Sequence, residues 1–126
     1  MKIPDSIRIN GIEHRVVWEN GLNDGAHVCH GHADFNYCTI RLNPDTQTYE
    51  KQCVTLLHEI LHVLLYNGRI EMPDDDEEDV VEVLSNGLYQ VLQDNGQRLF
   101  DLVQREEKFD FVQREEKKEA LTDDEA

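Results

Sequence analysis

Two histidines, four residues apart, enclose a glutamate in the run His58-Glu59-Ile60-Leu61-His62. In a helix, residues at this spacing lie on one face, so both imidazoles can reach one ion. Zinc is commonly bound by such nitrogen donors, and a carboxylate beside it can take a proton from a water molecule. The run therefore predicts a zinc ion bound by His58 and His62, with Glu59 as the catalytic base.

The residues around this motif strengthen the prediction of a metal. At about 100° per residue, the polar side chains of the segment fall in one narrow stripe, made of Thr55, His58, Glu59, His62 and Tyr66. The rest of the segment 54–65 is apolar, and a helix that is apolar on nearly every side is buried. Burying two imidazoles and a carboxylate is costly unless a partner satisfies them. A metal does so directly, and the alternative is a pair of core histidines satisfied by hydrogen bonds.

A catalytic zinc site usually takes three protein ligands and keeps one position open. Glu82 is the predicted third ligand because it lies inside the next predicted helix, with Asn86 one turn later to support a ligand from behind. Glu78, one turn before Glu82, is the main competitor. Glu82 also lies away from the apolar stripe of its helix, where a solvated side chain would lie as well.

A second cluster of possible ligands lies in Cys29-His30-Gly31-His32, with His27 nearby. It could hold a metal of its own or line the rim of the main site. The cluster has no second ligand pair at zinc-ribbon spacing, and polar residues of a loop without a metal are the commoner outcome.

The order of apolar, turn and capping residues along the chain predicts the strands and helices that position these side chains. Alternating apolar residues on both sides of Asn10-Gly11 predict a hairpin with a type I′ turn. After an irregular, turn-rich stretch, a strand is expected at Tyr37–Leu42. Two helices then follow, one over Tyr49–Asn67 with its stop at Gly68, and one from Pro73-Asp74 to Asn95-Gly96. The expected fold class is α+β, with a small antiparallel sheet packed on the two ligand-bearing helices.

The end of the chain contains a repeat of nine residues. Phe100–Lys108 recurs as Phe109–Lys117 with one difference. Two copies are too few for a repeat architecture, so a tandem duplication is the simpler explanation. Residues 99–126 are expected to form a charged helical tail with a frayed end that is peripheral to function, and partner binding is the alternative role.

The composition narrows the possible partners. The chain has 126 residues, enough for one domain, and a formal net charge of −15. Such a charge repels nucleic-acid phosphates and anionic lipid, so neither partner is expected. The three cysteines form no C-x-x-C pair, and the first residues lack the apolar run of a signal peptide. Free cysteines in a cytoplasmic protein are the expectation.

Three segments of the chain resemble the ImmA/IrrE-type metallopeptidases, a compact group of gluzincins common in phages and mobile elements. They are the strand ending Ile40-Arg41-Leu42-Asn43-Pro44, the helix Thr55–Leu65, and Glu82-Val-Leu-Ser-Asn86-Gly-Leu-Tyr89. The resemblance implies a minimal zincin-like fold over residues 1–98 and Glu82 as the third ligand. It also implies that the Tyr37–Leu42 strand is the sheet edge that receives an extended peptide, and that a phage-encoded chain acts in the host cytoplasm.

The expected function is that of a zinc metalloendopeptidase acting on a protein or peptide. Zinc polarises the scissile carbonyl and lowers the pKa of a water molecule, and Glu59 would pass the proton of that water to the leaving amine. Tyr66 and Tyr89 are candidates for stabilising the oxyanion. The alternative is a zinc-stabilised binding module without catalysis. A SprT-like role at DNA–protein crosslinks is disfavoured by the acidic balance and by the missing Cys-rich zinc ribbon.

Overall fold

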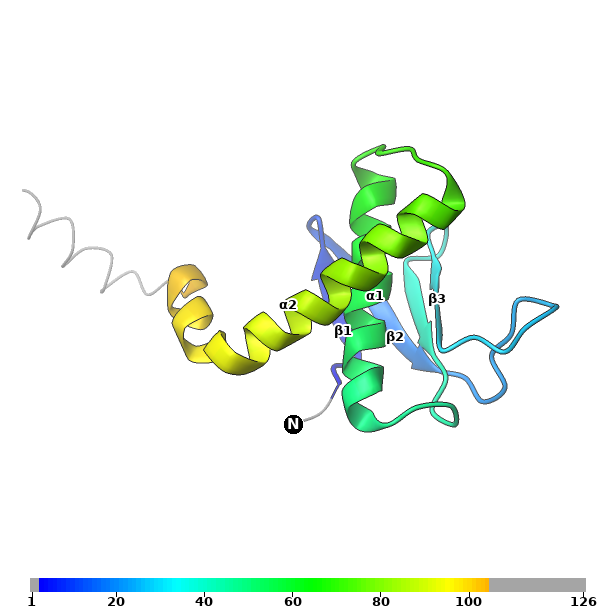
Figure 1. The fold of residues 1–126 in the computed structure, drawn as a ribbon, viewed down its shortest axis with the longest axis horizontal. Helices are drawn as coiled ribbons and strands as arrows, with labels where there is room; N and C mark the ends of the chain where they lie inside the picture. The colour runs from blue at the N-terminus through cyan, green and yellow to red at the C-terminus, as the bar shows by residue number, and fades with distance from the viewer. Residues whose placement is uncertain (1–2, 105–126) are drawn as a thin grey trace, which may run out of the picture. The chain divides into compact units, whose positions relative to one another are not determined.

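The computed structural model describes residues 3–104, which form four strands followed by two helices (Figure 1). The elements are β1 (Ser6–Ile9), β2 (Ile12–Trp18), β3 (Gly31–Asp34), β4 (Thr39–Leu42), α1 (Tyr49–Asn67) and α2 (Asp74–Val103). This order confirms the α+β class. By its internal contacts the chain divides into two units, Met1–Gln93 and Asp94–Ala126. All predicted site residues belong to the first unit, and most of the predicted tail lies outside the described residues.

The N-terminal hairpin forms as predicted. Strands β1 and β2 pair antiparallel, with Ile9 opposite Ile12 across the two-residue turn. Both turn residues have positive φ angles, 52° at Asn10 and 78° at Gly11. A type I′ turn needs this conformation at both positions, and asparagine followed by glycine adopts it at low cost.

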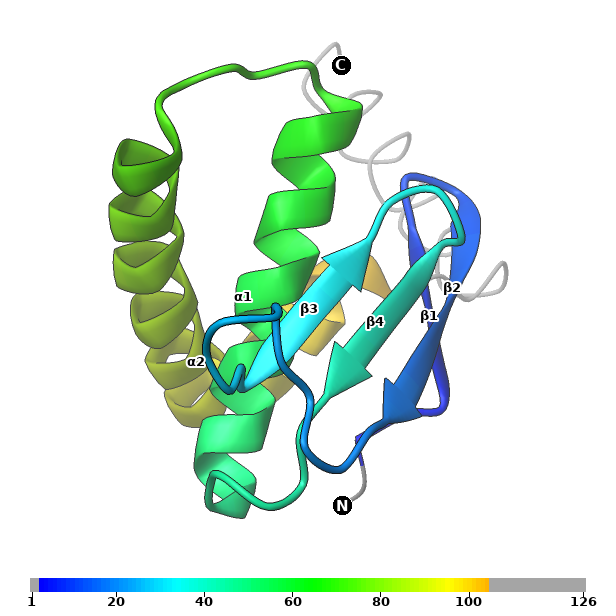
Figure 2. The ribbon, with the colours of Figure 1, turned by 90° about the vertical axis from the view of Figure 1, so that its right-hand side faces the viewer.

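The sheet is mixed, and this corrects the antiparallel sheet expected from the sequence. Its strand order is β1-β2-β4-β3, with β2 and β4 parallel and β3 and β4 antiparallel. The chain leaves β2, forms β3 at the edge and returns as β4 between them (Figure 2). The expectation that the Tyr37–Leu42 strand is the sheet edge is therefore wrong. The edge strand is β3, whose four residues, Gly-His-Ala-Asp, carry too weak an alternation to predict a strand.

Helix α1 covers one face of this sheet and contacts β1, β3 and β4. The core between them consists of buried apolar side chains: Ile9, Val16, Ala33, Ile40, Leu42, Leu56 and Val63. Burial of this set fixes the rotation of α1, because Leu56 and Val63 must face the sheet. The polar stripe that carries the two histidines is thereby held beside the start of β3.

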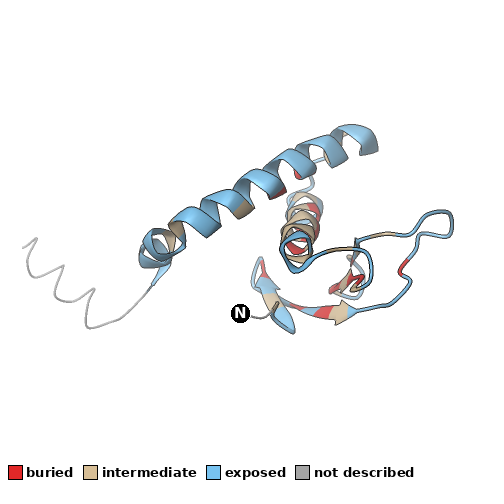
Figure 3. Cartoon of the chain, turned by 60° about the horizontal axis from the view of Figure 1, so that its bottom comes forward, coloured by how far each residue is buried: buried red, intermediate tan, exposed pale blue. Residues whose placement is uncertain are grey.

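Helix α2 begins at Asp74, as predicted, with four acidic residues in its first turn where they complement the helix dipole. The predicted end at Asn95-Gly96 is wrong, because the helix continues to Val103. Gly96 does not adopt a positive φ angle, and the good helix formers after it continue the helix. Most of α2 is exposed (Figure 3), and its buried residues are Val81 and Ser85. Neither helix, within residues 3–104, is both long and apolar enough to cross a membrane.

Candidate metal centre

The start of α1 is fixed by hydrogen bonds from the preceding loop. The side chain of Thr48 accepts a hydrogen bond from the backbone N–H of Lys51 and so caps the helix. One turn further on, the hydroxyl of Thr55 donates to Oε1 of Gln47 at 2.7 Å. From this capped end the polar stripe runs along α1 through His58, which is partly buried, to the buried His62.

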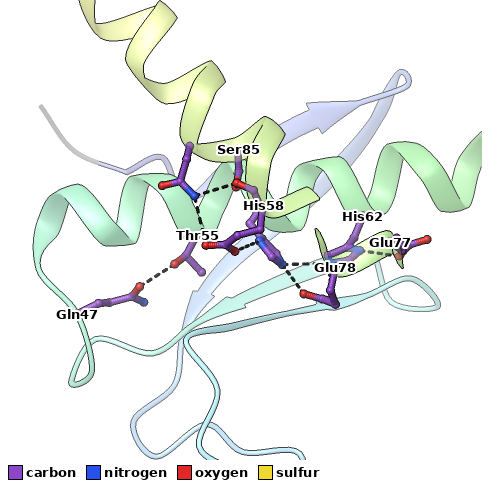
Figure 4. A network of polar contacts seen from close by, with 9 residues as sticks. Gln47, Thr55, His58, His62, Glu77, Glu78 and Ser85 are labelled. Atoms are coloured by element: carbon purple, nitrogen blue, oxygen red, sulfur yellow. Dashed lines mark hydrogen bonds and ion pairs between the residues drawn. The ribbon is translucent and has the colours of Figure 1, made fainter. Parts of the chain in front are cut away.

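The two predicted histidine ligands converge, as the i, i+4 spacing requires. The Nε2 atoms of His58 and His62 lie 3.1 Å apart. The carboxylate of Glu78 lies 3.2 Å from Nε2 of His58 and 2.9 Å from Nε2 of His62 (Figure 4). Among residues 3–104 these three side chains are the one group with donor atoms close enough together to share a metal ion.

The other nitrogen of each imidazole faces a different carboxylate from α2. Nδ1 of His62 lies 2.7 Å from Oε2 of Glu77, and Nδ1 of His58 lies 3.3 Å from Oε2 of Glu82. Carboxylates accept hydrogen bonds, so each of these contacts favours an N–H at the Nδ1 atom of the ring. Both Nε2 atoms face each other and the oxygens of Glu78. Electron-rich atoms this close together need a cation between them, either a proton or a metal ion.

The spacing of these atoms suits zinc. Ligand atoms about 2.0–2.1 Å from a tetrahedral ion lie about 3.3 Å from one another. The separations among the two Nε2 atoms and the Glu78 oxygens are 2.9–3.2 Å. Two imidazoles and one carboxylate are also the donor set of many catalytic zinc sites, so these residues fit the ion.

Glu82, the predicted third ligand, is not part of the group formed by His58, His62 and Glu78. The carboxylate of Glu82 contacts Nδ1 of His58 rather than the convergent Nε2 atoms. Asn86 holds it there, donating to Oε1 of Glu82 at 3.2 Å and to its backbone carbonyl at 2.8 Å. The expected support from Asn86 is thus present, but it orients Glu82 toward the outer side of a histidine. The competitor Glu78 occupies the position beside both Nε2 atoms.

Glu59 is 7% exposed and lies outside the group that could share a metal. Its burial raises the pKa of the carboxyl to about 7, with a further increase from Glu78 and an opposing decrease from His62. Gly31 of β3 approaches this part of α1 closely. A Cβ atom at Gly31 would lie 2.6 Å from Cγ2 of Thr55 and 3.2 Å from Cγ of Glu59.

A cleft of about 390 Å³ opens over these groups. Three segments line it: Cys29, His30 and Gly31 before and in β3; Gln47, Lys51, Val54, Thr55, His58 and Glu59 in and before α1; and Glu78, Glu82 and Asn86 in α2. Neither tyrosine proposed for the oxyanion lines the cleft. Tyr66 stacks on Phe35 instead, with ring centroids 4.2 Å apart.

Cys29, His30 and Gly31 of the second cluster line the cleft, in keeping with one of its two interpretations, whereas His27 and His32 do not. Its side chains have other partners: Nδ1 of His30 lies 2.8 Å from the hydroxyl of Thr46, and the thiol of Cys29 contacts the carbonyl of His27. Within the described part of the chain this cluster does not assemble a metal site. Cys29, Cys38 and Cys53 are free, as predicted.

Two residues of the site were missed by sequence reasoning. They are Glu77 and Lys51, neither of which was singled out in the sequence. No local pattern could identify either one, because their roles depend on how the segment after Gly68 turns α2 back over α1 and how α2 forms one wall of the cleft.

Comparisons of the chain with protein-family models, with curated proteins and with solved structures find no match. The function must therefore be inferred from the cleft itself.

Proposed function

We propose that this protein is a zinc-dependent peptidase in which His58, His62 and Glu78 bind the metal. One observation carries the proposal: both Nδ1 atoms face carboxylates while both Nε2 atoms converge with the carboxylate of Glu78. Glu78 replaces Glu82 as the third ligand because it alone of the two reaches both Nε2 atoms.

Glu77 and Glu82 are proposed as outer carboxylates that orient the ligand rings. Metal-binding histidines usually donate their second N–H to a carboxylate or carbonyl, which fixes the tautomer and the ring orientation. Here each histidine has its own carboxylate, at 2.7 Å for Glu77 and 3.3 Å for Glu82. The side chain of Glu77 is 26% exposed, so its hydrogen bond to His62 is partly shielded from water.

Glu59 is proposed as the general base. It lines the cleft beside His58 but lies outside the ligand group, as a base acting on a water molecule must. Zinc, when bound, supplies a Lewis acid that polarises a carbonyl and acidifies water. Glu59 would accept the proton of the attacking water and deliver it to the leaving amine.

The substrate is proposed to be an extended peptide lying beside β3. This strand is the sheet edge next to the cleft, and its outer backbone groups can pair with another extended chain. A helix bearing two histidines and a glutamate, an adjacent edge strand and an acidic second helix also support the minimal zincin-like fold that the ImmA/IrrE resemblance implies. The three free thiols are compatible with action in a cytoplasm.

The substitution Glu59→Gln tests this proposal. Zinc content is measured by atomic emission, and hydrolysis is followed by mass spectrometry on a random peptide library. We expect Glu59→Gln to retain one zinc per chain and to lose activity by about 10²–10⁴-fold. Glu13→Gln, an exposed glutamate of β2, is the matched control and should change neither quantity. Undiminished hydrolysis by Glu59→Gln would refute the proposed role of Glu59.

A further inference from the structure

Lys51 lines the cleft on the side of α1 nearest its N-terminus. It is the only lysine among residues 3–104 of a chain whose formal net charge is −15. The cleft otherwise contains three carboxylates, those of Glu59, Glu78 and Glu82, and no arginine. A single permanent positive charge therefore stands at one end of an otherwise acidic cleft.

The ammonium group of Lys51 has no ion-pair partner in the described part of the chain. The two arginines that do form ion pairs, Arg8 with Glu13 and Arg41 with Glu19, lie on the sheet. Lys51 is exposed, and within residues 3–104 no hydrogen bond is described for its side chain, while its backbone N–H donates to Thr48. Its charge is thus available to a bound molecule, and a flexible lysine readily pairs with a carboxylate.

The position of Lys51 on α1 sets its separation from His58 along the helix. It precedes His58 by seven residues, about two turns, so Lys51, Thr55 and His58 lie on one face of the helix and all line the cleft. At 1.5 Å per residue this separation is about 10 Å along the helix axis. An extended peptide advances about 3.4 Å per residue, so about three substrate residues would span the same length.

We propose that Lys51 is a carboxylate-binding subsite and that the preferred substrate carries a carboxylate about three residues from the bond that is cleaved. This inference rests on the proposed peptidase function and adds a substrate class to it. The carboxylate can be an aspartate or glutamate side chain or the C-terminus of the substrate. The remainder of the substrate is not acidic, since the charge of this chain repels further anions.

Cleavage of defined peptides by the zinc-loaded full-length protein tests the subsite. A cleavable bond found in a random library is placed in end-blocked decapeptides that carry one aspartate at each position in turn. A second set ends in a free carboxylate or an amide at varied distances from the bond. We expect about tenfold faster cleavage when either carboxylate lies about three residues away. Lys51→Gln should lose this preference and Lys51→Arg should keep it.

Arg15→Gln is the matched control, because it removes the same charge from an exposed residue of β2 outside the cleft. It should leave the preference unchanged. A preference that survives in Lys51→Gln, or that does not depend on spacing, would overturn the proposal.

Calorimetric binding of the same peptides to Glu59→Gln gives a readout that does not require hydrolysis. Adding Lys51→Gln to this variant should weaken binding of the carboxylate peptides about tenfold and leave binding of the neutral peptides unchanged. If binding depends on Lys51 but the wild type cleaves none of the peptides, the peptidase function is refuted and the carboxylate subsite stands. Cleavage or binding that does not depend on Lys51, or no binding of these peptides at all, would count against the subsite.

Discussion

The two imidazoles and four glutamates around the candidate metal centre divide into distinct sets by the atoms that they contact. Two Nε2 atoms and the carboxylate of Glu78 converge on one point, whereas Glu77 and Glu82 each contact an outward Nδ1 atom. Glu59 is buried in the cleft without joining either set. The proposed metal ion would stabilise this arrangement by lying between the two Nε2 atoms and the carboxylate of Glu78.

The buried carboxyl of Glu59 predicts how the stability of the metal-free protein depends on pH. Its pKa rises from an ordinary 4.5 to about 7 on folding, so the folded state holds its proton over this range while the unfolded state releases it. The free energy of unfolding therefore falls as the pH rises from about 4.5 to 7. Above pH 7 the stability lost through this group levels off at a value on the order of 3 kcal/mol, from 1.36 kcal/mol per pKa unit.

Glu59→Gln removes this cost, because a neutral amide is not ionised at any of these pH values. In EDTA, urea unfolding should give Glu59→Gln a higher free energy of unfolding than the wild type at pH 8. At pH 4, where Glu59 is protonated in both states, the difference should shrink toward zero. An equal difference at both pH values would show that ionisation of Glu59 is not its cause.

At the scale of the elements, the contact between β3 and α1 depends on Gly31. A Cβ atom there would lie 2.6 Å from Cγ2 of Thr55, closer than packed atoms allow. Gly31→Ala should therefore lower the free energy of unfolding by about 1–3 kcal/mol, as overpacking does. Gly87→Ala is the matched control, because its Cβ meets nothing within 4 Å on α2 and should stabilise the helix by about 0.5–1 kcal/mol.

Thr55→Ser tests the cause of the Gly31 effect. It removes the methyl group in question and keeps the hydroxyl that donates to Gln47. In a double-mutant cycle measured by urea unfolding, Gly31→Ala should cost less in the Thr55→Ser background. An identical cost in both backgrounds would place the strain elsewhere.

The elements also show what a sequence can predict. The hairpin at Asn10-Gly11, the bounds of α1 and the convergence of His58 and His62 depend on residues close in the chain, and all three were predicted. Strand β3 and the insertion of β4 beside β2 depend on pairing between distant segments, and they were not. The position of Glu78 beside both Nε2 atoms likewise depends on the turn between α1 and α2, which no spacing within α2 encodes.

At the scale of the whole molecule, the proposed metal centre would join α2 to α1. The buried residues of α2 are Val81 and Ser85, so few apolar contacts hold this helix in place. Its other links to α1 include the contacts of Glu77, Glu78 and Glu82 with the two histidines. Zinc bound by His58, His62 and Glu78 would connect the two helices and offset the repulsion among the carboxylates.

Thermal unfolding with zinc and with a chelator, on the wild type, Glu78→Gln and Glu82→Gln, tests the central claim most directly. Zinc at one hundred times its dissociation constant should stabilise the wild type by about 2.7 kcal/mol and so raise its Tm by several degrees. Loss of an outer carboxylate weakens metal binding about 10–100-fold, so Glu82→Gln should keep a reduced shift that recovers at higher zinc. Glu78→Gln should lose the shift over the same zinc range. The proposed centre would be contradicted if zinc did not raise the Tm of the wild type. It would also be contradicted if Glu82→Gln lost the rise in Tm while Glu78→Gln kept it.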